Sequence, residues 1–275
     1  MKKAFLISLI LILLVVLVAC SSLSNNTFAS FDYFATVITL YSSTSNDVAV
    51  NTAWSDIKED INTIEKTVSV YIEDSDIYKF NAAPQNTTIE ISLLTYNILS
   101  LAKEAYENTN GAYNPAMLLL SDLWGFTDRF THLDYEPEKT YDRQNPQTEL
   151  PNSEYVEGFL TLSDFSKVVL STQDDKYFVF KPDVSIEIDG IIYTMQLDLG
   201  GIVKGFATGR ITKILKSYNV EYGYTTLGSS SITLFERNKK GTKWDLSLKD
   251  PLDASNFYLK TPLSSAYIST SGNYE

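Results

Sequence analysis

A carboxylate, a pair of glycines and a lysine stand close together between residues 197 and 207. Asp198 precedes the adjacent glycines Gly200 and Gly201, and Lys204 follows them. Glycines let a backbone approach a ligand closely, and the free N–H groups of a new helix attract anions. An acid just before them could hold a ribose, an amine or a metal ion. The same spacing is also typical of a tight turn that leads into an ordinary amphipathic helix.

The flanking residues predict that this turn joins a strand to a helix. Residues 195–199 alternate like a strand, and the apolar residues that follow Lys204 recur at helical spacing. The predicted helix covers residues 204–218. The glycine pair is therefore expected at a strand-to-helix junction.

Two further helices and a hairpin are indicated by local signals. Apolar spacing predicts a helix over residues 48–68, with Asp47 as its cap, and another over residues 92–107, with Ser92 as its cap. The Asp189–Gly190 pair lies between two short apolar runs and predicts a two-residue hairpin turn.

Strands make up much of the remaining pattern. They are predicted over residues 31–41, 184–188, 191–193, 231–235, 244–248, 257–261 and 266–269. Residues 71–81 and 127–153 are expected to be irregular. This mixture predicts an α+β fold with a largely antiparallel sheet and argues against a doubly wound parallel one.

The N-terminus is typical of an export signal. Lys2 and Lys3 precede an apolar run from Ala4 to Val18, and a small residue stands before Cys20, as in a bacterial lipobox. We expect a signal peptide over residues 1–19, lipidation at Cys20, a tether over residues 20–30 and a folded domain over residues 31–275. The protein would then be lipid-anchored on the extracytoplasmic face of the cell membrane. An uncleaved transmembrane anchor is the alternative, although the run is slightly short for one.

The composition excludes several kinds of site. With Cys20 used as the anchor, no thiol remains for a disulfide, a cysteine-based metal site or a nucleophile. His132 is the one histidine, which argues against a multi-histidine metal site and a Ser-His-Asp triad. A metal ion should therefore be a hard cation held by oxygens, such as Mg²⁺. The formal net charge of −12 argues against nucleic acid or an anionic membrane surface as a partner.

Several stretches of the chain match the motifs of one known family in the family's own order. They are Phe34-Ala35-Thr36, Ser69–Asn81, Gly111–Phe126, Asp198–Ala207, Leu227–Ile232 and Ser269–Glu275. In turn they resemble M-G-T, S-x-Y-x-x-D-S-E-I-x-x-x-N, G-A-F-D-P with L-W-G-F, D-L-G-G/A-I-A-K-G-Y-A, L-G-G-D-I and S-T-S-G-D-Y-E-R of the ApbE family, the FAD:protein FMN transferases. One match would be weak evidence, but the common order makes the resemblance specific.

The resemblance implies one domain of two fused α/β lobes and a transferase activity. Family members cleave FAD, release AMP and move FMN onto a threonine of a partner flavoprotein. Mg²⁺ is the implied cofactor, because a divalent cation neutralises charge that develops on phosphoryl oxygens. The implied partners are FAD, which is the substrate, and an exported electron-transfer flavoprotein that accepts FMN.

Site residues are carried over from the family position by position. The resemblance implies that Phe34 and Tyr71 border the flavin or adenine. It implies that Ala112, Tyr113 and Asn114 contact FAD, the first two partly through backbone, and that Asp198 and Lys204 hold the dinucleotide. Ser271 and Gly272 would lie near the phosphates, and the backbone carbonyl of Gly201 would be a ligand of Mg²⁺. No residue is assigned a catalytic role.

The chain departs from the family pattern at three places. Asn114 stands where the family usually has aspartate, and Phe34 stands where it usually has methionine. After Glu275 the family continues with a histidine, an Ile-Asp-Pro motif and a D-A-x-x-T-like segment that supplies side-chain metal ligands. The sequence given therefore resembles only the first part of a transferase, and we expect weak Mg²⁺ binding and little turnover from it.

Other interpretations stay open. A Mg²⁺-dependent FAD pyrophosphatase would share the site and use water as the acceptor, and a non-catalytic FAD-binding lipoprotein would capture FAD without turnover. A solute-binding lipoprotein fits less well, because two parallel-sheet lobes would then be expected. Taken singly, Tyr71 could be an ordinary aromatic, Gly111 a helix C-cap, Trp124 and Phe126 core residues, and Thr270–Gly272 a plain loop.

Overall fold

The computed structural model describes residues 24–33, 36–44, 46–127, 150–220, 222–228, 230–250, 253 and 255–271. The predictions for Cys20, Phe34, His132 and Gly272 lie outside these residues, as do the predicted signal peptide and most of the stretch 127–153. Within the described residues, no helix is both long enough and apolar enough to cross a membrane.

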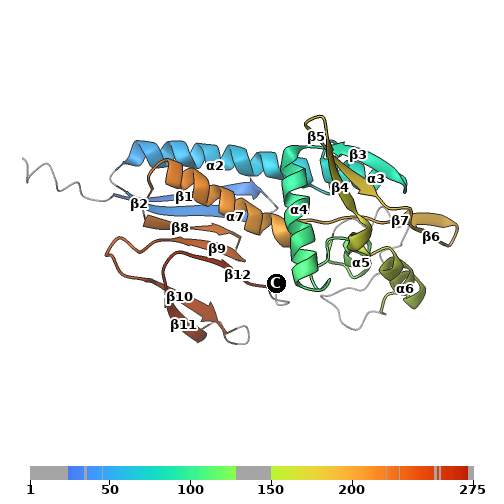
Figure 1. The fold of residues 1–275 in the computed structure, drawn as a ribbon. Helices are drawn as coiled ribbons and strands as arrows, with labels where there is room; N and C mark the ends of the chain where they lie inside the picture. The colour runs from blue at the N-terminus through green and yellow to red at the C-terminus, as the bar shows by residue number, and fades with distance from the viewer. Residues whose placement is uncertain are drawn as a thin grey trace, which may run out of the picture. The chain divides into compact units, whose positions relative to one another are not determined.

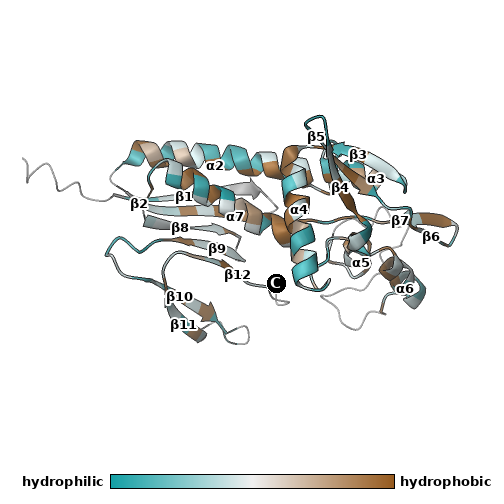
Figure 2. Ribbon diagram, in the orientation of Figure 1, coloured by the Kyte–Doolittle hydropathy of each residue, from teal (hydrophilic) through white to brown (hydrophobic). Residues whose placement is uncertain are grey.

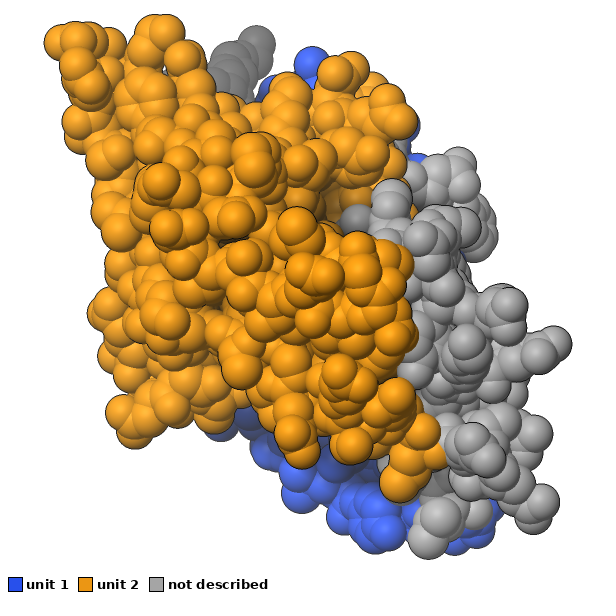
Figure 3. Space-filling view, turned by 90° about the vertical axis from the view of Figure 1, so that its right-hand side faces the viewer, with its two compact units in different colours: residues 1–61, 207–275 blue, residues 62–206 orange. Residues whose placement is uncertain are grey.

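The fold is α+β, as predicted, and the strand pairs of the described residues are all antiparallel. The chain divides into two compact units, coloured separately in Figure 3. Unit 1 comprises residues 1–61 and 207–275, and unit 2 comprises residues 62–206. The boundaries fall inside two long helices, α2 (Asp47–Val68) and α7 (Gly200–Ser217).

Unit 1 is built on a five-stranded sheet of order β1-β2-β8-β9-β12 (Figure 1). Its strands are β1 (Ser24–Tyr33), β2 (Thr36–Thr44), β8 (Tyr222–Leu227), β9 (Ser231–Phe235) and β12 (Ala266–Ser269). A separate hairpin pairs β10 (Trp244–Lys249) with β11 (Phe257–Leu263). In Figure 1, α2 and α7 run along one face of the five-stranded sheet. The core beneath them is apolar: Ile38, Leu40, Val50, Ile57, Ile61, Ala207, Ile211, Leu215 and Leu227 are at most 1% exposed.

The N-terminal part of unit 1 differs from the prediction. The strand expected over residues 31–41 is the end of β1 and most of β2, and residues 24–30, expected in the tether, form most of β1. The backbone of this segment pairs with β2, and the Phe28 ring packs 5.6 Å from the ring of Trp54 on α2. Pairing with the strand that follows it satisfies backbone groups that a solvated tether would leave to water.

The start of helix α2 and its capping residue both lie one residue earlier than the sequence predicted. The Asn46 Oδ1 atom accepts the Ala49 N–H at 3.1 Å, so Asn46 is the capping residue. Asp47 is the first residue of the helix, and its carboxylate accepts a hydrogen bond from the Asn26 amide at 2.8 Å. Figure 2 shows hydrophilic and hydrophobic residues alternating along α2, as its amphipathic pattern requires.

Unit 2 contains a three-stranded sheet of order β3-β5-β4 and a β6–β7 hairpin. The strands are β3 (Thr87–Ile91), β4 (Val169–Gln173), β5 (Lys176–Lys181), β6 (Ser185–Ile188) and β7 (Ile191–Thr194). The helices are α3 (Asp76–Ala82), α4 (Leu93–Asn108), α5 (Leu118–Leu123), α6 (Ser153–Thr161) and the 3₁₀ turn η3 (Phe165–Lys167).

Two predictions in unit 2 are confirmed and one is wrong. Ser92 caps α4 by accepting the Thr95 N–H, and Asp189 and Gly190 form the hairpin turn with φ values of 52° and 78°. The stretch 71–81 was expected to be irregular, but its second half forms α3. A seven-residue helix has too few turns for its periodicity to show in the sequence.

Candidate active site

Helix α7 begins at the glycine pair and not at Lys204, where the sequence had predicted its start. Asp198 explains the difference, because its Oδ1 atom accepts the Gly200 N–H at 2.7 Å and so satisfies an amide of the first turn. The glycines therefore lie inside the helix. Lys204 stands one turn further along, half-buried, and its ammonium group has no hydrogen bond or ion pair with another described residue.

The segment that precedes α7 is extended but is not a strand. Met195, Leu197 and Leu199 are buried, so the predicted alternation holds, yet residues 195–199 pair with no strand of the described chain. The side chain of Asn81 takes the place of a neighbouring strand. Its Oδ1 accepts the Leu197 N–H at 2.7 Å, and its Nδ2 donates to the Leu197 carbonyl at 2.9 Å. The next amide, that of Asp198, donates to the Pro115 carbonyl at 2.8 Å.

Tyr113 meets the start of α7 directly. A Cβ atom added to Gly201 would lie 3.2 Å from the Tyr113 ring carbon Cε2, which is tighter than nearly all real contacts. The Tyr113 hydroxyl is buried and has no hydrogen-bond partner among the described residues. Burial raises its pKa well above the ordinary value, and the nearby charge of Asp198 adds to the rise. The hydroxyl thus stays protonated and can donate to a ligand.

The residues beside Tyr113 are held by internal hydrogen bonds. The Ala112 N–H donates to the Thr109 carbonyl at 3.1 Å, and the Tyr113 N–H donates to the Thr109 hydroxyl at 3.0 Å. Both amides are therefore engaged within the turn. The Asn114 Nδ2 donates to the Ser163 carbonyl at 2.6 Å, and its Oδ1 accepts the Ala116 N–H at 2.9 Å. Both ends of the Asn114 amide therefore fix the loop that carries Tyr113.

The motif Ser69–Asn81 turns out to be largely a scaffold. The Ser69 hydroxyl accepts the Tyr71 N–H at 3.1 Å, and Ser75 caps α3 by accepting the Tyr78 N–H at 2.9 Å. The Tyr71 side chain is left 58% exposed, which suits a surface that stacks on a planar ligand. Its assignment to the flavin or adenine stays a prediction.

A metal site does not emerge from the described residues. No group of three or more His, Cys, Asp or Glu side chains in that part of the chain could hold an ion. Gly201 is the second residue of α7, so its carbonyl points toward the amide four residues on, and one lone pair stays available. Its role as a Mg²⁺ ligand remains a prediction.

Unit 1 brings together three other motif stretches. The Gly228 N–H donates to the Val37 carbonyl at 2.8 Å, and the Thr270 N–H donates to the Ser230 carbonyl at 2.8 Å. Gly228 has φ +62°, and a Cβ there would lie 2.6 Å from the Thr36 hydroxyl, so only glycine fits. Ser271 follows Thr270 as an exposed residue. The motif stretches thus fall into two groups, one in each unit.

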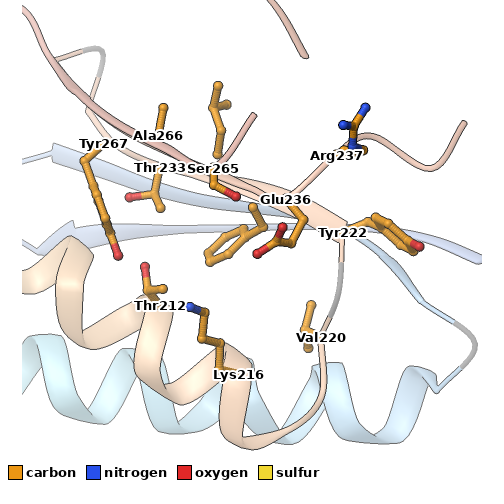
Figure 4. A pocket seen from close by; sticks show the side chains of 12 residues that line it. Thr212, Lys216, Val220, Tyr222, Thr233, Glu236, Arg237, Ser265, Ala266 and Tyr267 are labelled. Atoms are coloured by element: carbon orange, nitrogen blue, oxygen red, sulfur yellow. The ribbon is translucent and has the colours of Figure 1, made fainter. Parts of the chain in front are cut away.

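A cavity of about 560 Å³ in unit 1 contains none of the predicted site residues. Its walls come from α7, β8, β9, β12 and adjoining turns: Thr212, Lys216, Val220, Tyr222, Thr233, Leu234, Phe235, Glu236, Arg237, Ser265, Ala266 and Tyr267. Figure 4 shows the Lys216 ammonium and the Glu236 carboxylate inside the cavity, whereas the Arg237 side chain points away. Two opposite charges do not select a ligand class, so the cavity is not the candidate site.

Sequence reasoning missed the role of Lys181. This side chain is fully buried, and its ammonium donates to the carbonyls of Phe80, Asn81 and Ala83 at 3.1, 3.0 and 2.7 Å. A lysine at the end of a strand-like run ordinarily indicates a solvated charge. Only the fold shows that it meets the C-terminal end of α3.

The chain is similar to known proteins in both sequence and structure. A protein named FAD:protein FMN transferase from Buchnera aphidicola is 23% identical over 219 residues, which are 79% of this chain and 57% of that protein. The protein of the same name from Haemophilus influenzae is 26% identical over 198 residues, which are 70% and 50% of the two chains. The chain thus spans about half the length of the curated relatives it matches.

Solved structures show the same fold. The ApbE protein from Thermotoga maritima superposes with a TM-score of 0.71 at 25% identity, over 92% of this chain and 72% of that one. The flavin transferase ApbE from Vibrio cholerae gives 0.68 at 19% identity, over 91% and 73%. The sequence matches the ApbE family over residues 34–275. These residues include all of the motif stretches, and the chain belongs to the ApbE family.

Proposed function

We propose that the protein is an FAD:protein FMN transferase. It would cleave the pyrophosphate of FAD, release AMP and transfer FMN to a threonine of an exported flavoprotein. One observation carries the proposal: Tyr113 lies close to Asp198 and to the glycine pair at the start of α7. This arrangement gives a hydroxyl donor, a carboxylate and, one turn later, a cation, all of which a dinucleotide can use.

The residues of the chain have distinct tasks in this proposal. The Tyr113 hydroxyl, which lacks a partner among the described residues, donates a hydrogen bond to FAD. The Asp198 carboxylate keeps one oxygen on the Gly200 amide and offers the other to a ribose or amine of the ligand. The Lys204 ammonium attracts the pyrophosphate. None of these groups is a base that could deprotonate the acceptor threonine, so the catalytic base is left unassigned.

Mg²⁺ dependence is part of the proposal. The ion would neutralise charge on the departing phosphate, which is what a hard cation supplies in phosphoryl transfer. No cluster of three acidic, histidine or cysteine side chains that could hold the ion is found among the described residues, so its side-chain ligands are left unassigned. The Gly201 carbonyl would add one protein ligand.

We also propose an anchor at Cys20 and an extracytoplasmic location. The support is the apolar run from Ala4 to Val18 with a small residue before the cysteine. The acceptor would accordingly be an exported electron-transfer flavoprotein.

A single assay separates the proposed transferase from the alternatives. The full chain is incubated with FAD and Mg²⁺, with and without an acceptor flavoprotein of the source organism, and AMP release and covalent flavin fluorescence of the acceptor are followed. Acceptor labelling together with acceptor-dependent AMP release supports the transferase. AMP release without acceptor favours a pyrophosphatase. FAD binding with neither product, also after the family's C-terminal metal-ligand segment has been joined to the chain, favours a non-catalytic flavin-binding protein.

A further inference from the structure

Helix α3 is fixed at both ends although it has only seven residues. At its start, the Asp76 carboxylate accepts the Ser92 N–H at 2.8 Å and the Thr95 hydroxyl at 2.7 Å. At its end, the Lys181 ammonium donates to three carbonyls. A helix of this length is not stable by itself, so such bracing from other parts of unit 2 keeps it in place.

Lys181 is an unusual cap for a helix. The C-terminal end of a helix is its negative end, and an ammonium there satisfies carbonyls that have no partner within the helix. The Lys181 side chain is fully buried, and no carboxylate of the described residues pairs with it. Its bonds are therefore directed at the backbone of α3, and they fix the carbonyl of Asn81 itself.

Helix α3, fixed in this way, holds the segment before α7 in place. The Asn81 side chain is 7% exposed and makes both of its hydrogen bonds to the backbone of Leu197, which is 116 residues away in sequence. Asp198 is the next residue, and Gly200 and Gly201 follow within one turn. A displacement of Asn81 would therefore be passed directly to the carboxylate and to the glycine that faces Tyr113.

We infer that Asn81 and Lys181 are positioning residues for the ligand site at the start of α7. Lys181 fixes the end of α3, Asn81 fixes Leu197 to that end, and Asp198 and Gly201 are thereby held against Tyr113. The inference rests on the proposed function for the identity of the ligand, FAD, and on the contacts above for the rest. Neither residue needs to touch FAD.

The test compares substitutions at the two positions with a matched control. N81L removes both hydrogen bonds at similar volume, N81D keeps the acceptor and loses the donor, and K181M removes the ammonium. N97L is the control, because Asn97 is exposed on α4 and its side chain makes no hydrogen bond to another described residue. The full chain is used throughout, at a temperature well below the melting point of the least stable variant.

Two quantities are measured on each variant. Amide hydrogen exchange, without ligand, is followed in peptides that cover residues 195–203 and, as a reference, strands β3 and β5. FAD affinity is followed by quenching of flavin fluorescence in the presence of Mg²⁺. We expect N81L and K181M to speed exchange in 195–203 and to weaken FAD binding about tenfold, which corresponds to the loss of one or two net hydrogen bonds. N81D should be intermediate, and N97L should match the wild type.

Each outcome decides the inference. Faster exchange spread evenly over unit 2, or looser residues 195–203 with unchanged FAD affinity, would show that the two residues only stabilise the fold. If N81L does not fold, N81D and K181M give the same comparison. If the wild type itself binds no FAD, the proposed function fails, whereas the exchange pattern still decides whether Asn81 and Lys181 hold the segment before α7.

Discussion

The ring of Tyr113 lies against the α-carbon of Gly201, so close that a Cβ on residue 201 would sit 3.2 Å from ring carbon Cε2. The contact joins the loop after α4 to the first turn of α7. It explains why residue 201 must be small without any appeal to backbone strain, because this glycine does not have a positive φ.

Substitution of Gly201 by alanine should therefore separate stability from binding. Alanine favours the helix by up to about 1 kcal/mol, and the displaced Tyr113 ring opposes this gain. We expect the free energy of unfolding in G201A to stay within about 1 kcal/mol of wild type while FAD affinity falls. Urea unfolding and flavin fluorescence titration measure the two effects.

Gly209 provides the control for that substitution. It lies on the same helix, and a Cβ there would meet nothing within 4 Å. G209A should raise stability by roughly 0.5–1 kcal/mol and leave FAD affinity unchanged. Equal FAD affinity in G201A and G209A would contradict the assigned importance of the Tyr113 contact.

The Tyr113 hydroxyl gives a second prediction. Since it is buried without a partner among the described residues, its removal in Y113F relieves an unsatisfied polar group. We expect unchanged or slightly higher thermal stability and, if the hydroxyl donates to FAD, an affinity lower by about tenfold. A Y113F protein that binds FAD as tightly as wild type would remove Tyr113 from the proposed site. Y155F is a useful contrast, because the Tyr155 hydroxyl already donates to Asp189 at 2.9 Å and its loss should lower stability.

Asn114 should not tolerate the aspartate that the family usually carries there. Its Nδ2 donates to the Ser163 carbonyl at 2.6 Å, and a carboxylate cannot donate. We expect N114D to lose about 1–3 kcal/mol of stability at neutral pH. The loss should shrink in acid, where a protonated carboxyl regains a donor. N97D, on the exposed face of α4, serves as the charge-matched control in urea unfolding at both pH values.

Lys181 predicts a rise of stability in alkaline solution. Burial lowers its pKa from 10.5 to about 8, so the unfolded chain binds this proton more tightly than the folded one. The stability cost is full below about pH 8 and disappears as the pH approaches 10.5. The free energy of unfolding should therefore increase between about pH 8 and pH 10, by an amount that the three hydrogen bonds of the ammonium reduce.

The control for this pH effect is the replacement of the lysine itself. K181M should lack the increase, whereas K176M, at a largely exposed position, should keep it. Tyr113 and Tyr155 do not disturb the comparison, since burial raises the pKa of each above 10.0 and their effect begins only beyond that pH. A rise of the same size in K181M would assign it to other groups.

The ion pair between Arg210 and Asp60 should be weak but measurable. The Arg210 Nε atom lies 3.0 and 2.7 Å from the two carboxylate oxygens, and the pair joins α7 to α2 within unit 1. The Arg210 side chain is 44% exposed and that of Asp60 is 15% exposed, so water screens the attraction in part. A double-mutant cycle of R210A and D60A should give a coupling of about 0.5–1 kcal/mol that declines with salt.

The pair Lys176–Glu90 is the comparison for that cycle. Both side chains are more than half exposed, at 57% and 56%. Its coupling should be close to zero. Equal coupling in the two cycles would mean that the contact of both Nε and Nη2 of Arg210 with the Asp60 carboxylate adds nothing.

Local signals account for the parts of the fold that the sequence predicted well. Ser92 and Asp189–Gly190 act on their own neighbours, so the cap of α4 and the β6–β7 turn are legible in a few residues. The start of α7 was predicted late because glycine is a poor helix former, and the compensating bond from Asp198 to Gly200 is not visible as a pattern.

The structural features that the sequence did not predict depend on contacts between residues far apart in the chain. The motif order pointed to Tyr113 and Asp198, but the contact of Tyr113 with Gly201 joins residues from distant parts of the chain. Residues 195–199 have the alternation of a strand, and only the fold reveals that an asparagine side chain replaces the neighbouring strand. Spacing within a sequence carries no information about such partners.

The bracing of α3 also has a consequence for the order of folding. Asn81 bonds to a residue 116 positions later, and Lys181 meets the Phe80 carbonyl across 101 positions. Contacts that close such long loops form slowly, and a helix this short is not stable before those contacts form. We therefore expect the neighbourhood of Asp198 to form late in folding. A chain emerging from the ribosome would complete this part of its fold only after Leu197 has been synthesised and has docked onto Asn81, which is made much earlier.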